Sequence, residues 1–345
     1  MNLLIFWVVS IFCVTAKISD KLGVPQVVSF SNKLVPKLLQ SLLPGRENIV
    51  VAPFGLATNL AMVMEAVEKN LEDERAGPML TSNNNVLKQA LRHGFKALLE
   101  DFEQTKHDEE VVGSFNRAII RSSSPLPPSY KEILEIFYMA NITQGTHLSN
   151  SSDFVLELQS DAGIMSHWKD YQKMAVYTYL RHQSSAPFTT SKGDTVEVPM
   201  VPQFGTFRIG YLPRLKSQAV ELLLEAPHVS LLLIMPDLRE AIDEVLVKIS
   251  NEKLSFLAKS LPAQECEVVL PQLVVVTNDI DLSPFLRLIG LSDLFASFNA
   301  TDKHKQRKGM VAFIKQRAYF ATSFISVNSV GSSGVSLGKR LKMNL

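Results

Sequence analysis

The side chains that could carry out chemistry in this 345-residue chain are few and scattered. A serine hydrolase needs an activated serine, and no Gly-x-Ser-x-Gly turn that would expose one is present. None of the seven histidines forms a pair at helical metal-ligand spacing, and two cysteines cannot build a cysteine-based zinc site. The segment GVSLGKR lacks the four-residue gap between glycines that a phosphate loop requires. The sequence therefore predicts a protein that is not an enzyme and that uses no metal and no cofactor.

The charge balance excludes partners that need a strong field. Thirty-five Lys and Arg stand against 34 Asp and Glu, which leaves a formal charge of +1 and gives no long-range attraction for nucleic acid or an anionic membrane. One local basic run could bind a sulfated polyanion, although such a run is more often a solvated loop. Its members are Lys303, Lys305, Arg307 and Lys308.

The first sixteen residues predict a signal peptide. MNLLIFWVVSIFCVTA is apolar, too short for a comfortable membrane span, and ends with the small-residue pattern of Val14 and Ala16. Cleavage after Ala16 removes Cys13 and leaves Cys266 alone, so no intrachain disulfide can form in the mature protein. We therefore expect secretion to the extracellular space, with glycan at one or more of three sequons. These begin at Asn141, Asn150 and Asn299.

The pattern of apolar residues changes from helical to strand-like along the chain. Helical periodicity predicts helices over 27–43, with an interruption near Pro36, and over 56–70, 87–102 and 130–139, with strands at 48–53 and 109–120. Later segments read mostly as strands, with short helices at 238–249 and 283–289. The strand segments are 174–180, 195–200, 205–211, 219–225, 229–236, 265–276 and 318–327. Helices first and strands later predict an α+β fold, with residues 17–345 as a single domain.

Several phrases, in order, resemble those of one protein family. NIVVAP, SFNRAII, VEVPMVPQFGTFRIGY, VVLPQLVVV and FISVNSVGSS follow the order and spacing found in the serpin family of serine protease inhibitors, from about residue 27 to about residue 338. The matching positions are Asn48, Ile49, Val50, Pro53, Asn116, Val196, Val198, Pro199, Met200, Gly205 and Phe207.

The resemblance implies a fold of three β-sheets with about eight or nine helices. It also implies a suicide mechanism, in which a protease cleaves an exposed loop and the loop then inserts as an extra strand into the large sheet. The energy comes from a native sheet that is left without a strand that it could accommodate.

The loop region departs from the family pattern. The hinge-like segment is Gly331, Ser332, Ser333 and Gly334, and Ser329 stands where the family usually has an acid. Only Lys339 to Leu345 follow Gly338, so the resemblance implies a divergent, C-terminally truncated member without the bait segment and the last strands. If insertion started at Gly331, the strand would span about half of a large sheet.

Residues that control sheet opening in the family also look changed. Two serines near the early proline align with Ala52 and Gly55, an asparagine with Val176 and a histidine with Ala321, which predicts loss of a polar cluster. A tryptophan near the top of the sheet aligns with Ser184, and a lysine that would pair with the hinge acid aligns with Gln272.

We therefore expect a secreted serpin-family protein that has lost protease inhibition and acts as a binding or carrier protein. The alternative is a suicide-type inhibitor of serine endopeptidases whose C-terminal tail is missing from this sequence.

Overall fold

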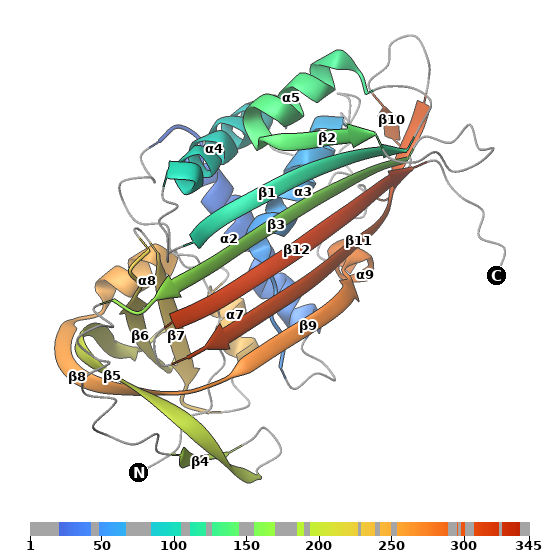
Figure 1. Ribbon diagram of the computed structural model, residues 1–345. Coiled ribbons are helices and arrows are strands. Elements are labelled where there is room, and N and C mark those ends of the chain that lie inside the picture. Colours follow the sequence, from blue (N-terminus) through green and yellow to red (C-terminus); the bar gives the residue numbers. More distant parts are fainter. Residues whose placement is uncertain are drawn as a thin grey trace.

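The computed structural model describes most of the chain outside its two ends. The described residues are 21–42, 48–66, 84–104, 111–121, 126–144, 155–169, 185–189, 194–226, 229–238, 242–249, 254–288, 295, 298–300, 307–323 and 326–338. Figure 1 shows a large twisted sheet with helices behind it and a smaller group of strands below. This arrangement confirms the predicted α+β class.

Among the described residues, seven strands form the large sheet, in the order β10-β11-β12-β3-β1-β2, with β9 paired to β11 on the edge away from β12. Only β1 and β2 run parallel, and the remaining neighbours are antiparallel. The bounds are β1 Val111–Arg121, β2 Ala140–Gln144, β3 Val155–His167, β9 Val274–Asp281, β10 Phe298–Ala300, β11 Arg307–Thr322 and β12 Ser326–Gly338.

Five strands form the second sheet, in the order β4-β5-β6-β7, with β8 paired to β5. Its apolar side chains pack against the large sheet through a core that includes Trp168 and Phe320. The bounds are β4 Ser185–Thr189, β5 Thr195–Leu212, β6 Ser217–Leu223, β7 Ser230–Pro236 and β8 Ala263–Pro271.

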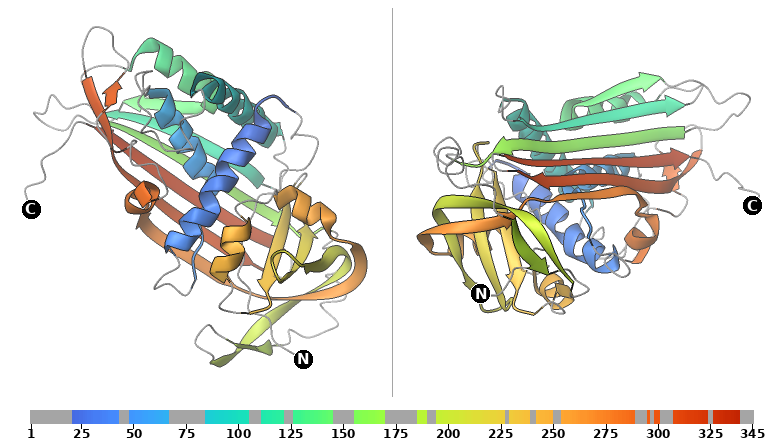
Figure 2. Two further views of the ribbon diagram at one scale, coloured as in Figure 1. Left: turned by 180° about the vertical axis from the view of Figure 1, so that it is seen from behind. Right: turned by 60° about the horizontal axis from the view of Figure 1, so that its bottom comes forward.

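The larger helices cover one face of the large sheet, as the view from behind in Figure 2 shows. The bounds are α2 Val24–Leu42, α3 Pro53–Ala66, α4 Asn84–Gln104, α5 Pro128–Tyr138, α7 Ile242–Ile249, α8 Leu254–Ser260 and α9 Ser283–Leu286. None of the helices in the described segments is apolar over the length that crossing a bilayer requires.

Two expectations for the first part of the chain are wrong. Helix α2 runs through Pro36 without a break, because its buried face packs into the main core and outweighs the one hydrogen bond that proline removes. Residues 48–52 form no strand. The N–H of Val50 instead donates to the hydroxyl of Thr277 at 2.7 Å, so a side chain replaces a ladder partner.

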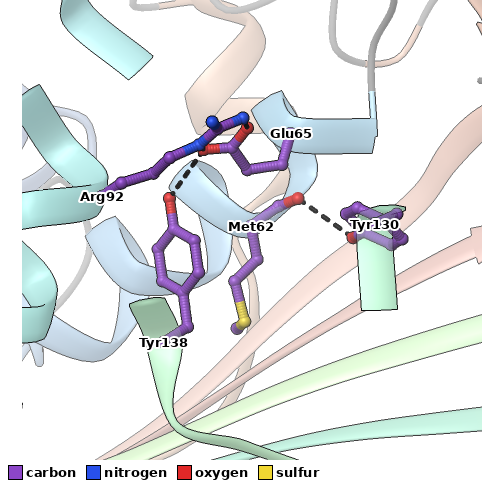
Figure 3. Close-up of polar contacts among 5 residues, drawn as sticks. All are labelled: Met62, Glu65, Arg92, Tyr130 and Tyr138. Carbon is purple, nitrogen blue, oxygen red and sulfur yellow. Dashed lines mark hydrogen bonds and ion pairs between the residues drawn. The ribbon is translucent and has the colours of Figure 1, made fainter. Parts of the chain in front are cut away.

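A buried ion pair ties α3, α4 and α5 together (Figure 3). The Glu65 side chain is 1% exposed, and both of its oxygens accept from Arg92, Oε1 from Nε at 2.8 Å and Oε2 from Nη2 at 2.6 Å. The Tyr138 hydroxyl donates to Oε1 at 3.2 Å, and the Tyr130 hydroxyl donates to the Met62 carbonyl at 3.0 Å. The bidentate bond to Glu65 raises the pKa of Arg92, and burial together with Glu65 raises the pKa of Tyr138. The cluster fixes α3, the helix that lies directly under the centre of the large sheet.

Candidate functional site at the central strand of the large sheet

Strand β12 occupies the centre of the large sheet, between β11 and β3 (Figure 1). Its thirteen residues pair with β3 without interruption, from Ser326 opposite His167 to Gly338 opposite Val155. Because β11 and β3 are both antiparallel to β12, they are parallel to each other. The hinge-like residues Gly331 to Gly334 therefore lie inside a complete antiparallel array, and the two flanking strands do not touch.

The strand begins earlier than the sequence suggested. The segment 318–327 reads as one strand, but the structure ends β11 at Thr322 and starts β12 at Ser326. The Ser323 N–H donates to the Ser326 carbonyl at 2.9 Å, and the Ser326 N–H donates to the Ser323 hydroxyl at 3.0 Å, which joins the two strands where the chain turns back. The strand that contains the hinge-like residues therefore starts at Ser326 instead of Gly331, so it is longer than the stretch counted from Gly331.

Trp168 holds this turn at the end of the sheet. It is 2% exposed, and its indole N–H donates to the Ser323 carbonyl at 2.9 Å. We expected the position of the family's tryptophan to correspond to Ser184, which lies outside the described residues. The strand Val155–His167, which leads to Trp168, was not predicted from the sequence. Its polar residues Glu157, Gln159 and Asp161 alternate with buried ones, a signal that could have identified it.

Small side chains on the inner face of β12 allow close packing on α3. Gly331 and Ser333 are buried and face the beginning of that helix, whereas Val330 points outward and is exposed. A methyl group added at Gly331 would overlap the Cβ of Ala52. The glycine is thus required by a close approach of two segments more than 250 residues apart in sequence.

A polar cluster lies beneath β12, which corrects the expectation that it was lost. Gln316 of β11 accepts from the Ala52 N–H at 3.0 Å and donates through Nε2 to the Ala52 carbonyl at 2.9 Å and to the Ser333 hydroxyl at 2.7 Å. Asn59 of α3 donates to the Ser333 carbonyl at 2.6 Å. One glutamine thus joins the segment before α3 to the central strand, a role that sequence reasoning missed.

Of the four positions expected to have lost this cluster, Ala52 and Gly55 lie beside it. Val176 falls outside the described residues. Ala321 of β11 pairs with Asn328, farther along the two strands than the Gln316–Ser333 pair. Ser160 of β3 stands opposite Ser333, and its hydroxyl has no hydrogen-bond partner. An unpaired buried hydroxyl costs free energy, so the Ser160–Ser333 position is less well satisfied than the main-chain ladders around it.

The arrangement around β12 holds a strand mainly through its main-chain hydrogen bonds. The middle inner positions of β12 are the small residues Ser329, Gly331 and Ser333, so the two main-chain ladders supply most of the attachment there, at about 0.5–1.5 kcal/mol net for each hydrogen bond. In the described part of the chain, no group of three or more His, Cys, Asp or Glu side chains could hold a metal ion.

The remaining predicted site residues come from separate elements or fall outside the described residues. Asn141 is exposed on β2, Asn299 lies in β10 opposite Lys308, and Asn150 falls outside the described residues. In the basic run, Arg307 and Lys308 begin β11, whereas Lys303 and Lys305 fall outside the described residues. Gln272 is exposed between β8 and β9, and its N–H donates to the Pro199 carbonyl at 2.8 Å.

Comparisons with known proteins agree on one family. The family model Serpin (serine protease inhibitor) matches residues 179–333. Serine protease inhibitor 42Dd of Drosophila melanogaster is 24% identical over 365 residues, covering 97% of this chain and 89% of that protein. Emu ovalbumin superposes with a TM-score of 0.74 at 16% identity over 92% of each chain. Cleaved kallistatin complexed with heparin superposes with a TM-score of 0.70 at 14% identity, covering 91% of this chain and 98% of that one. The structural likenesses, taken alone, show a shared fold.

Proposed function

The chain belongs to the serpin family, and we propose that it is a member without protease-inhibitory activity that acts as a binding or carrier protein. Members of this family are not enzymes in the catalytic sense. One observation carries the proposal. The centre of the large sheet is already filled by β12, in a chain that continues from β11 to β12 through a single turn.

The occupied sheet removes the source of energy for inhibition. The family mechanism needs a sheet into which a cleaved loop can insert, so that burial of a new strand drives translocation of the protease. Here β3 and β11 already bond to β12 over its length, and no vacant position lies between them. A protease that cut the chain after β12 would gain no strand insertion, so it would deacylate and leave.

The first prediction concerns proteases. After incubation with trypsin-like and chymotrypsin-like enzymes, we expect no protein–protease band that survives boiling in detergent, because no insertion step competes with deacylation. Nicking should also leave the melting temperature nearly unchanged, since the sheet is already complete. A known inhibitory serpin run alongside serves as the positive control. A boiling-resistant band would support the alternative of an inhibitor with a missing tail.

The second prediction concerns export, for which we propose a signal peptide over 1–16 followed by one domain over 17–345. Asn141 is exposed on the edge strand β2, where its side chain is open to modification. Mass spectrometry of protein from the medium of secretory cells should find Lys17 at the amino terminus and glycan on Asn141. An unprocessed Met1 in exported material would contradict the signal peptide. An unmodified Asn141 peptide would contradict glycosylation at that residue.

A polyanion site is the third prediction, and it rests on the basic run Lys303, Lys305, Arg307 and Lys308. The heparin in the kallistatin structure favours the same class of ligand here. Neutralising all four residues to glutamine should lower the salt concentration that elutes the protein from immobilised heparin. A protein with fewer cations displaces fewer counterions from heparin when it binds, so its binding is weaker. Changing Lys96 and Lys131, exposed lysines on α4 and α5, provides the matched control. Equal shifts for both sets would refute a specific site.

A further inference from the structure

One face of the large sheet has no helix over it among the described elements. In Figure 1 the strands β1, β3, β12 and β11 lie in front, and Figure 2 shows α2, α3, α4 and α5 on the opposite side. Side chains alternate between the faces along each strand. Residues that pair across neighbouring strands share a face, so the register identifies which side chains point outward.

Apolar side chains gather on this open face toward the Trp168 end. Phe115 and Met165 are each 47% exposed, and Val330 is 52% exposed. Tyr319 pairs with Val330 on one side and with Val276 on the other, so the row continues to the edge strand β9. We call this surface the open-face patch; its members are Phe115, Met165, Val330, Tyr319, Val276 and Val274. Such a gathering on a protein surface marks an interaction site.

The main chain of the sheet determines what kind of segment can cover the patch. At the patch, strands β3, β12 and β11 have a paired neighbour on both sides, so most of their N–H and C=O groups are already used. A segment that lies on the face must satisfy its own backbone, which favours an α-helix over an added strand. A helix about 10 Å wide would cover two to three strands at their spacing of about 4.8 Å.

The carboxylate of Asp161 beside the open-face patch indicates which charged side chain the partner would carry. Asp161 stands directly opposite Phe115, and its oxygens accept only from Gln159 Nε2, each at 3.1 Å, in the described part of the chain. Two arginines on this face have other partners: Arg317 binds Asp279 at 2.9 Å, and the Arg117 guanidinium lies over the Phe115 ring at 5.3 Å, so neither pairs with Asp161. A cation that enters beside the apolar patch would therefore complement the Asp161 carboxylate.

We propose that the open-face patch docks an amphipathic helix of a partner protein, with a Lys or Arg beside its apolar stripe placed at Asp161. This deepens the binding role proposed above by naming its surface and partner class. The protease assay tests the loss of inhibition separately, so either proposal can fail without the other.

The test uses a fluorescein-labelled 18-residue peptide of leucine and lysine, arranged as an amphipathic helix, titrated with the full chain by anisotropy. The double change Met165→Thr and Val330→Thr keeps β-compatible side chains but removes apolar surface, and should weaken binding about tenfold or more. Asp161→Asn should weaken binding several-fold at low salt, and should have no effect on a leucine–glutamine peptide. Lys315→Gln, on the same face outside the patch, is the matched control and should bind as the unchanged protein does.

A photo-reactive residue in the apolar stripe of the peptide should crosslink to β3 or β12, as mapped by mass spectrometry. Unchanged affinity in the Met165/Val330 double variant, with an unchanged melting temperature, would overturn the proposal. So would crosslinks confined to other elements. Sedimentation that shows a dimer weakened by the same double change would assign the patch to a second copy of this chain and overturn the helical partner.

Discussion

Replacing Gly331 by alanine is expected to lower the free energy of unfolding by about 3 kcal/mol or more, the upper range for overpacking a tight core. The added methyl group would overlap the Cβ of Ala52, and neither segment can retreat easily. Ala52 is held through both of its main-chain groups by Gln316, and Gly331 is held in the ladders to β11 and β3. Chemical denaturation monitored by circular dichroism measures the loss.

Two variants separate this clash from a general effect of glycine replacement. Gly334 lies three residues along the same strand, and the nearest atom to an added methyl there is the Leu158 carbonyl oxygen at 4.0 Å. Gly334→Ala should therefore be neutral or stabilise by about 0.5–1 kcal/mol, because glycine is unfavourable inside a strand. Adding Ala52→Gly to Gly331→Ala removes the overlapping atom and should restore most of the loss. Equal destabilisation by both alanine changes, or no rescue, would show that β12 does not sit against Ala52.

Replacing Arg92 by methionine is expected to cost about 3–5 kcal/mol, because it leaves the carboxylate of Glu65 buried without its cation. Methionine keeps most of the aliphatic stem, so the loss reports charge and hydrogen bonding more than packing. Because the pair anchors α3 to α4 and, through Tyr138, to α5, the variant should also expose the amides of α3 to faster hydrogen exchange.

The matched control removes both charges together. The double change Glu65→Gln and Arg92→Met leaves no uncompensated ion, so it should be clearly milder than Arg92→Met alone. Lys88 could partly compensate the charge of Glu65 in the Arg92→Met variant and so reduce its loss of stability. Burial lowers the pKa of Lys88, whereas attraction to Glu65 raises it. If the single and double variants lose equal stability, the ion pair contributes no specific coupling.

Local sequence signals predicted much of the fold. The periodicity over 130–139 predicted α5, and the β-branched run over 109–120 predicted β1 to within two residues at its start. These elements follow their own pattern because the apolar spacing of a helix or strand fixes which face is buried. The α+β class followed from the same local patterns, whereas the serpin family was implied by the resemblance of ordered phrases. The pattern indicated two strands at 195–200 and 205–211, which the structure joins into one continuous strand, β5.

Tertiary structure decided the features that bear on function. The segment 318–327 has continuous strand propensity, and only pairing with two partners and the Trp168 contact show that it turns at Ser323. Likewise, no local pattern marks Gln316 as the residue beneath β12, because its partners Ala52 and Ser333 come from distant segments. The sequence by itself determined the α+β class, because apolar periodicity is a local property, and the resemblance of its ordered phrases implied the family. The filled sheet, the rebuilt polar cluster and the open-face patch were decided by long-range register, which depends on contacts between segments far apart in the chain.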